Sequence, residues 1–403
     1  MKKQIYLDYA ASAPLDPKVF REMAPFLKKH FGNASSLHQC GQKVRAAIEQ
    51  ARETVAKFLR CSPMEAVFTS GATEANNLVV QGVARAWRKK TGTKKAHIVV
   101  SALEHESVLA CAKELESRGE IEAVYVKPDE NGIINSKDVM RAIKDNTALV
   151  SIMYANSEIG TIQPIAEIGE LIKAHNAEHP GNRVLFHTDA VQAAHWLDCG
   201  AQKLGVDALT LSSHKIYGPK GAGALYIRES ANVAPLIHGG NQEYGMRSGT
   251  ENTAAIVGFG FAVAQLMDLR LPVMNIAIRQ MRDRLIKSVL KRIPNASLTG
   301  SSEKRLPNNA HFLFQGVRGK DLAIALDQEG IAVSTGSACS EKTEEASHVL
   351  LALGIDAKDA LCALRVTLGR HTKKEEIEKT VKILAKTVIR LRKVGTNAKE
   401  FAE

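Results

Sequence analysis

The sequence lacks the features that mark secreted and membrane proteins. Residues 1–14 contain two lysines, but no apolar stretch and no small-residue cleavage site of the kind that a secretory signal needs. No window approaches the roughly 20 consecutive apolar residues of a membrane span. We therefore expect a cytoplasmic protein that does not interact with membranes.

Paired cysteines are also lacking. The six cysteines are scattered along the chain and form no CxxC pair. Zinc sites usually show such pairs, and disulfide scaffolds are short chains dense in cysteine. We therefore expect neither a metal site nor a disulfide framework. No internal repeat is evident either, and the only polar tract follows residue 394.

The charge balance is basic, with 54 Lys and Arg against 43 Asp and Glu and a formal net charge of +11. Such a balance favours anionic ligands or acidic partners without identifying them. The basic residues are spread widely along the sequence and form no RNA-binding signature, so we expect no direct binding of nucleic acid. A solvated basic surface is the simplest interpretation.

Short β-rich runs alternate with helical patterns from about residue 15 to residue 260. The intervening segments 73–87 and 107–117 repeat apolar residues at helical spacing. This alternation predicts an α/β fold with a mostly parallel mixed sheet covered by helices on both faces. The expected strands are 66–69, 97–100, 148–153, 183–186, 207–211 and 224–227.

A different pattern follows residue 260. A long helical stretch reaches about residue 292, and a final helix carries apolar residues on one face. Between them lie strand-like runs at 311–314 and 363–367 and a helix near 322–329. We predict a large domain formed by residues 15–262 and a smaller α+β domain formed by residues 1–14 and 263–403.

The most informative stretch is 212–221, where an apolar run delivers Ser, His and Lys into a Gly/Pro turn. A lysine held at the end of a strand can form an imine with an aldehyde cofactor. Taken alone, however, Lys215 is equally well explained as a surface lysine beside an ordinary turn. The other predicted strand ends decide between these interpretations.

Several chemically capable residues follow predicted strands, where ligands bind in open α/β sheets. Gly71 and Thr73 stand where a helix N-terminus can hold a phosphate, although the same residues can simply cap the helix. His105 and Asn156 follow two further strands.

An aspartate and a lysine follow two neighbouring predicted strands. In pyridoxal phosphate chemistry, Lys215 would hold the aldehyde while Asp189 keeps the pyridine nitrogen protonated. A structural Asp–Lys salt bridge is the alternative, but it leaves the phosphate-type site at residues 70–74 unexplained. Near the C-terminal end, Cys339 lies in a run of small residues that leaves its thiol accessible, which favours a reactive cysteine.

Together these segments resemble the pyridoxal-phosphate-dependent cysteine desulfurases, of the IscS/NifS-like long-loop type within the class-V aminotransferases. The similarity runs from residue 6 to about residue 370. It is carried by SGATE at 70–74, HKIYGPKG at 214–221, RSGT at 247–250 and the STGSAC run that ends at Cys339. The resemblance implies a fold-type-I PLP-transferase fold, as in aspartate aminotransferase, and a homodimer with active sites near the subunit interface.

The resemblance also implies a role for each motif residue. Lys215 corresponds to the imine lysine, Asp189 to the partner of the ring nitrogen, and His105 to the residue that stacks on the ring. Arg365 corresponds to the arginine that binds the substrate carboxylate, although an ordinary ion pair would also explain it. The remaining implied contacts are Gln192 and Asn156 to the ring oxygen and substrate, and Gly71, Ala72, Thr73, Ser212, His214 and the other subunit's Thr250 to the phosphate.

The implied reaction converts L-cysteine to L-alanine and leaves the sulfur as a persulfide on Cys339. An acceptor protein, such as an iron–sulfur scaffold or a sulfur carrier, would then take the sulfur for iron–sulfur clusters or for tRNA and cofactor thiolation. A selenocysteine lyase uses the same fold and cofactor. A non-catalytic scaffold or sulfur-relay paralogue is disfavoured because all the catalytic residue types are present.

Overall fold

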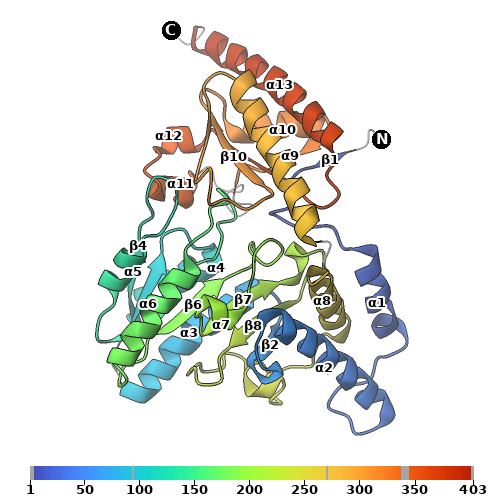
Figure 1. Cartoon of the computed structure of the whole chain (residues 1–403), viewed down its shortest axis with the longest axis vertical. Helices are drawn as coiled ribbons and strands as arrows, with labels where there is room; N and C mark the ends of the chain where they lie inside the picture. Colours follow the sequence, from blue (N-terminus) through green and yellow to red (C-terminus); the bar gives the residue numbers. More distant parts are fainter. Residues whose placement is uncertain (1–3, 93–94, 269–270, 337–344, 401–403) are drawn as a thin grey trace.

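The computed structural model describes residues 4–92, 95–268, 271–336 and 345–400, without the side chains of 271–272 and 394–400. Cys339 lies outside the described residues. Figure 1 shows a large lobe built around a wide sheet and a smaller lobe above it that contains both chain termini. Within the described ranges, no helix is long and apolar enough to cross a membrane.

The large lobe contains a seven-stranded sheet in the order β2-β8-β7-β6-β5-β3-β4. Strand β8 runs antiparallel to both of its neighbours, and the other pairs are parallel. This mostly parallel mixed sheet confirms the predicted α/β class. The strands are β2 (Ala66–Thr69), β3 (Ala96–Ser101), β4 (Ile121–Val126), β5 (Thr147–Ser151), β6 (Leu185–Asp189), β7 (Ala208–Ser212) and β8 (Gly223–Ile227).

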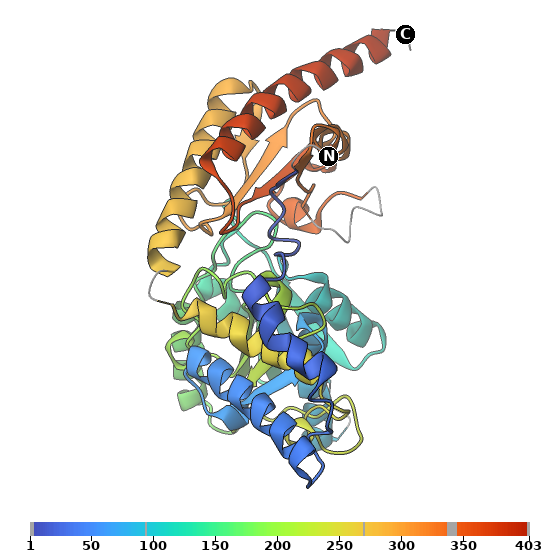
Figure 2. The ribbon, with the colours of Figure 1, turned by 90° about the vertical axis from the view of Figure 1, so that its right-hand side faces the viewer.

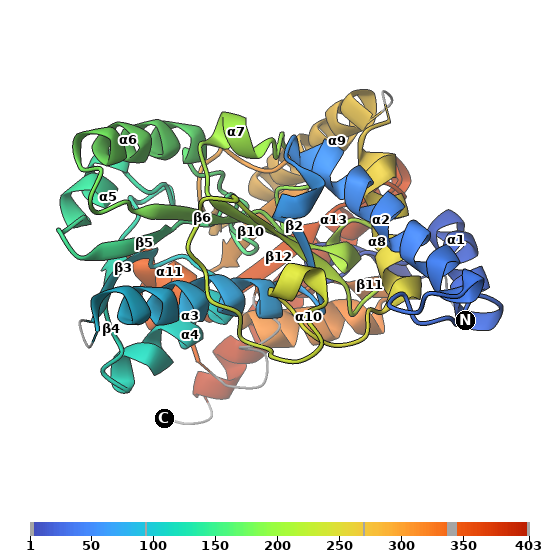
Figure 3. The ribbon, with the colours of Figure 1, turned by 90° about the horizontal axis from the view of Figure 1, so that it is seen from below.

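Helices cover both faces of this sheet (Figure 3). Consecutive residues of β2 belong to different hydrophobic cores. Phe68 packs in the core beneath α2 (Gln39–Leu59) and α8 (Thr253–Leu266). Val67 packs in the core beneath α3 (Ala72–Thr91) and α4 (Glu106–Ser117). Burial on both faces explains why the central strands read as nearly continuous apolar runs. The same lobe contains α1 (Pro17–Lys28), η1 (Pro63–Glu65), α5 (Ser136–Ala142), α6 (Ile165–Glu178), α7 (Ala201–Leu204), η2 (Ser213–Lys215) and η3 (Glu243–Gly245).

The small lobe is built on an antiparallel sheet in the order β12-β10-β9 and on a two-stranded sheet that pairs β1 with β11. The N-terminal strand β1 therefore belongs to the small lobe, and the chain then runs down into the large lobe (Figure 2). Its elements are β1 (Ile5–Tyr6), α9 (Leu271–Arg292), β9 (Ala296–Leu298), β10 (Asn309–Phe314), α10 (Gly319–Gln328), β11 (Ile331–Ala332), α11 (His348–Ala352), α12 (Ala357–Ala360), β12 (Ala363–Thr367) and α13 (Lys374–Glu400).

The long helical stretch expected after residue 260 is two separate helices. Helix α8 ends at Leu266 and packs on α1 and α2, whereas α9 begins at Leu271 and packs on α13 in the small lobe. The domain boundary that we predict at 262–263 therefore falls within α8. The division into two domains remains our proposal.

The basic charge is concentrated rather than spread. Helices α9 and α13 together contain fourteen Lys and Arg against five Asp and Glu, so these two helices hold nine of the eleven excess positive charges of the chain. Both helices lie side by side on the outer side of the small lobe (Figures 1 and 2). The excess charge thus marks one end of the molecule.

Candidate active site

A cavity of about 530 Å³ lies where strands of the large sheet end. Its walls come from the turns after β2, β3, β6 and β7, from the N-terminal segment 10–12, and from Gly336 and Arg365 of the small lobe. The volume is in the range that small-molecule sites usually have. Ten of the thirteen predicted site residues line it: Gly71, Ala72, Thr73, His105, Asp189, Gln192, Ser212, His214, Lys215 and Arg365.

Lys215 ends the short helix η2, directly after β7. Its Nζ donates hydrogen bonds to the backbone carbonyls of Ala10 and Ala11, both at 2.7 Å. Gln192 Nε2 also donates to the carbonyl of Ala10, at 2.9 Å. The N-terminal segment that descends from the small lobe therefore fixes the position of the lysine amine in the cavity.

The turn after Lys215 contains a residue in an unusual backbone conformation. Tyr217 has a φ of +67°, which is rare for a bulky residue, and its side chain is almost completely buried. Its hydroxyl accepts a hydrogen bond from the Arg370 backbone N–H at 2.8 Å, and the Arg370 guanidinium lies 3.5 Å from its ring centroid. These contacts hold the strained turn in place. Such strain is often found where a functional side chain must be aimed.

Asp189 is the last residue of β6, and both of its carboxylate oxygens accept hydrogen bonds. Oδ2 accepts from Asn76 Nδ2 at 2.8 Å, and Oδ1 accepts from the Val191 N–H at 2.9 Å. The Asn76 amide also donates to Ser107 Oγ at 2.8 Å. A continuous chain of hydrogen bonds thus begins at Asp189 and leads away through Asn76.

This hydrogen-bond chain ends at His105, which caps helix α4. His105 Nδ1 accepts from the Ser107 N–H at 3.1 Å and lies 2.8 Å from Ser107 Oγ. Because Nδ1 is an acceptor here, a neutral His105 carries its proton on Nε2. His105 also lines the cavity, so the network fixes both the ring and its tautomer.

The helix N-terminus beside the cavity is left without a side-chain cap. Gly71 is the N-cap of α3, and among the residues that the structure describes no side chain caps the first N–H groups of this helix. Gly71 has φ of 154° and ψ of 179°, a region that essentially only glycine occupies. Of the two interpretations that the sequence leaves open here, the uncapped geometry favours an anion-binding helix N-terminus.

A histidine and a serine hydroxyl lie near this helix N-terminus. His214 Nδ1 is 3.2 Å from Ser12 Oγ, and its ring lines the cavity together with Ser212. Burial, with the neighbouring Lys215 and Lys220, lowers the pKa of His214 to about 4. His214 is therefore neutral at pH 7 and can donate one hydrogen bond to an anion.

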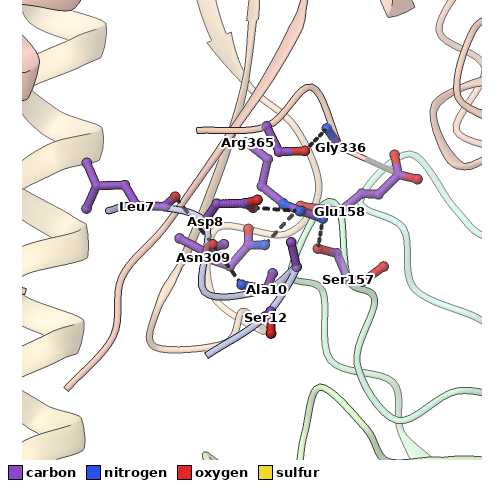
Figure 4. A network of polar contacts seen from close by, with 12 residues as sticks. Leu7, Asp8, Ala10, Ser12, Ser157, Glu158, Asn309, Gly336 and Arg365 are labelled. Carbon is purple, nitrogen blue, oxygen red and sulfur yellow. Dashed lines mark hydrogen bonds and ion pairs between the residues drawn. The ribbon is translucent and has the colours of Figure 1, made fainter. Parts of the chain in front are cut away.

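Arg365 reaches the cavity from β12 and is already fixed by two contacts (Figure 4). Its Nη2 pairs with Asp8 Oδ1 at 2.9 Å, and its Nη1 donates to the Ser157 carbonyl at 3.0 Å. Within the described part of the chain, its buried Nε has no hydrogen-bond partner. Arg365 nevertheless lines the cavity, where the fork of N–H donors on a guanidinium suits an anionic group.

Three predicted residues do not line the cavity. Asn156 is buried, with Oδ1 accepting from the Glu158 and Ile159 N–H groups and Nδ2 donating to the Leu103 carbonyl. Thr250 is exposed and lies in an adjoining pocket that shares Ser70, Gly221 and Ala222 with the cavity. Cys339 lies outside the described residues, but Gly336, three positions earlier, lines the cavity.

Sequence reasoning missed two groups of residues at this site. Ala10 and Ala11 act through backbone carbonyls, so their side-chain types give no signal. Asn76 lies inside a helix, where an amide reads as an ordinary surface residue; only its burial reveals its role. The similarity beginning at residue 6 is the one sign that the N-terminal segment takes part.

Pyridoxal phosphate fits this set of groups. The uncapped N-terminus of α3, with Thr73, Ser212 and His214, provides donors for a phosphate, and the carboxylate of Asp189 provides an acceptor for a protonated ring nitrogen. The amine of Lys215 lies in the same cavity, where an aldehyde would need it. Gly223 allows β8 to approach the Gly71 backbone closely, because a Cβ on Gly223 would lie 2.7 Å from it.

Comparison with known proteins agrees with this geometry. The aminotransferase class-V family model matches residues 5–380. A cysteine desulfurase IscS from Dictyoglomus turgidum is 43% identical over 100% of this chain and 98% of its own length, and one from Clostridium botulinum is 43% identical over 98% and 97%. A solved NifS-like protein is 34% identical with a TM-score of 0.86, covering 95% of this chain and 98% of its own.

Proposed function

The chain belongs to the aminotransferase class-V family, and from this premise we propose that it is a cysteine desulfurase that delivers sulfur for iron–sulfur cluster assembly. The enzyme depends on pyridoxal phosphate. The observation that carries the proposal is the single cavity in which Lys215, Asp189, His105 and Arg365 meet. This grouping also favours an enzyme over a non-catalytic paralogue, because a scaffold has no need to assemble these groups.

Each of these side chains has a defined task in the proposed reaction. When bound, pyridoxal phosphate supplies a ring that accepts electrons from the amino acid. Asp189 would hold a proton on the ring nitrogen, and Lys215 would hold the cofactor at its aldehyde group and move the Cα proton of the substrate. Arg365 orients the α-carboxylate with its remaining donors. His105 would contact the ring and take up the proton of the substrate thiol.

The sulfur-transfer step requires a thiolate, for which we propose Cys339. Its Sγ forms a bond to the substrate sulfur while the bond between that sulfur and Cβ breaks. The electron pair of the broken bond stays with Cβ, which takes up a proton, so the products are L-alanine and a persulfide on Cys339. Gly336, three positions before Cys339 in the sequence, lines the cavity.

The described cysteines support this assignment by their environments. Burial raises the pKa of Cys61 to about 12 and that of Cys111 to about 11, and it also raises the pKa of the fully buried Cys199. Thiols of this kind stay protonated at neutral pH and react poorly. Cys40 is exposed in the first turn of α2 and Cys362 is buried, and neither of them lines the cavity.

We further propose that the active unit is a homodimer in the cytoplasm. Thr250 is exposed in a pocket adjoining the cavity, a position from which it can reach the phosphate site of another copy. Large apolar side chains are exposed on α1 and in the loop after it, which favours a covered surface. They are Phe20, Leu27, Phe31 and Leu37, with exposed fractions of 52%, 62%, 85% and 93%.

The decisive experiment compares Cys339→Ala with Cys61→Ala. We expect the Cys339→Ala enzyme to keep its yellow colour and the absorption band that borohydride shifts, but to lose alanine production from L-cysteine. Cys61→Ala should keep both. Undiminished turnover of Cys339→Ala would overturn the assigned nucleophile, and a colourless wild-type protein purified with ample cofactor would overturn the enzyme itself.

A selenocysteine lyase is the alternative reaction in the same site. Steady-state rates of alanine production from L-cysteine and from L-selenocysteine separate the two activities. We expect turnover with L-cysteine to depend on Cys339. Activity confined to selenocysteine would reassign the enzyme.

A further inference from the structure

Two carboxylates hold the end of β2 and the turn that leads into α3. Strand β2 is an edge strand, and among the described residues no strand pairs with its outer edge. On that edge the Phe68 N–H donates to Glu243 Oε2 at 2.8 Å, and the Ser70 N–H donates to Glu74 Oε2 at 2.9 Å. The two carboxylates thus take the place of a neighbouring strand, and the second one fixes the backbone just before Gly71.

Each of these carboxylates is paired with an arginine. Arg52 Nη1 and Nη2 donate to the two oxygens of Glu243 at 2.6 and 2.8 Å, and Arg247 Nε donates to Glu74 Oε1 at 2.8 Å. Glu243 and Arg247 lie four residues apart on the segment that follows β8, so one loop takes part in both pairs. The side chains of Arg247 and Glu74 are only 23% and 16% exposed, so water screens their interaction weakly.

Glu74 lies at the same helix end as the proposed phosphate site. It is the third residue of α3 and lines the cavity together with Gly71 and Thr73. A glutamate in the first turn of a helix is common, because negative charge is favourable there. The phosphate of the cofactor would use the same helix N-terminus, however, so an unbalanced carboxylate at this position would repel it.

Arg247 resolves this conflict by balancing the charge of Glu74. Burial opposes the ionisation of Glu74, but the hydrogen bonds from Arg247 and Ser70 outweigh this effect and lower the pKa of the carboxyl. Glu74 is therefore an anion at neutral pH, and the pair as a whole is neutral. Arg247 does not line the cavity itself but the adjoining pocket, so it contacts Glu74 from outside the cavity.

We propose that Arg247 is a positioning residue for cofactor binding: it neutralises Glu74, and the N-terminus of α3 thereby stays available to the phosphate of pyridoxal phosphate. This inference rests on the proposed function, because it takes that helix end as the phosphate site. Glu74 is retained because its carboxylate holds the Ser70 N–H, and with it the turn at Gly71. Arg247 acts through Glu74.

The test titrates the apoenzyme, prepared from the full-length protein, with pyridoxal phosphate and follows the absorbance of the bound cofactor. In Arg247→Ala the Kd should rise by about tenfold, the order expected for two like charges that share one protein cavity. Adding Glu74→Gln to this variant should restore the Kd to within about threefold of wild type, because glutamine removes the charge and keeps an acceptor for the Ser70 N–H.

Pyridoxal separates this effect of charge from a general loosening of the loop. It lacks the phosphate, so Arg247→Ala and the wild-type protein should bind it with the same Kd. A purely structural role of Arg247 would weaken the binding of pyridoxal and of pyridoxal phosphate equally. Arg247→Lys keeps the positive charge and should bind pyridoxal phosphate nearly as the wild type does.

Arg183→Ala is the matched control, because Arg183 pairs with the buried carboxylate of Asp207 at 2.6 Å and neither residue lines the cavity. Its Kd for pyridoxal phosphate should equal that of the wild type. If Arg247→Ala does not fold, Arg247→Gln, which keeps more of the side chain, takes its place.

Three results would overturn the role of Arg247: a wild-type Kd in Arg247→Ala, equal losses for pyridoxal and pyridoxal phosphate, or no recovery on adding Glu74→Gln. Failure of the proposed function is distinguishable from these. A wild-type enzyme that binds pyridoxal phosphate but makes no alanine from L-cysteine would overturn that function, whereas the titrations report on Arg247.

Discussion

Two buried carboxyl groups near the cavity differ in their hydrogen-bond partners. Asp189 has a donor for each oxygen. Glu104 accepts from Ser101 Oγ and from the Met153 N–H through Oε1 alone, and among the described residues its Oε2 has no partner. Burial raises the pKa of Glu104 to about 8, partly opposed by these two donors. Glu104 therefore holds a proton over much of the neutral range.

Because Glu104 binds this proton more tightly in the folded protein, its titration makes the free energy of unfolding depend on pH. The folded protein keeps the proton up to about pH 8, whereas the unfolded chain releases it near the ordinary value of 4.5. Between these values the folded state binds more protons, so the free energy of unfolding falls as pH rises. In Glu104→Gln this contribution is absent, so the stability of the variant relative to wild type should rise by on the order of 3 kcal/mol from pH 5 to pH 8.

Urea unfolding of both holoenzymes at pH 5, 6, 7 and 8 measures this difference. Glu303→Gln, a change at an exposed carboxylate, serves as the control and should keep a constant difference from wild type. A constant difference for Glu104→Gln as well would contradict the assigned protonation.

At the scale of elements, the sequence predicted those strands that are buried on both faces. The expected ranges 66–69 and 363–367 coincide with β2 and β12. Strand β4 was not expected, because it lies at the sheet edge and interrupts its apolar residues with the exposed Glu122. Strands β1 and β11 have two residues each and exist only because distant segments pair, so no local pattern predicts them.

The same distinction applies to the candidate site. Residues that directly follow central strands could be located from sequence, because strand ends in a parallel sheet converge. The contacts of Ala10 and Ala11 could not, since backbone carbonyls have no sequence signature. The buried position of Asn156 outside the cavity lining could not be predicted from sequence either. An asparagine after a strand is equally typical of a ligand-binding residue and of a residue that orders a turn.

The turn at residues 157–160, between β5 and α6, is bonded to the small lobe, and this predicts a stability effect at Asn309. Its buried amide donates to the Glu158 carbonyl and accepts from Arg305 Nη1. Asn309→Leu keeps the volume but leaves two buried groups without this partner, and each such loss costs about 1–3 kcal/mol. We expect the free energy of unfolding to fall by about 3 kcal/mol in urea titrations. The exposed Asn131→Leu should change it little, and equal stability of the two variants would contradict the role of the turn.

At the scale of the whole molecule, the exposed apolar residues of α1 and the following loop predict association. Phe31→Asp together with Leu37→Asp should convert the proposed dimer to monomers in sedimentation equilibrium, because charges would face the apolar surface of the second copy. Ile324→Asp, a change at a 52% exposed residue of α10, is the matched control. A wild-type protein that sediments as a monomer at all concentrations would contradict the proposed dimer.

The two basic helices α9 and α13 make the charge distribution of the molecule asymmetric. Most of the excess positive charge lies at one end. Electrostatic attraction therefore steers a negatively charged protein toward the small lobe before the two proteins make contact. Such guidance extends over little more than the screening distance, about 8 Å in physiological salt. The speed of encounter with an anionic protein should therefore fall steeply as ionic strength rises, while the chemistry inside the cavity does not change.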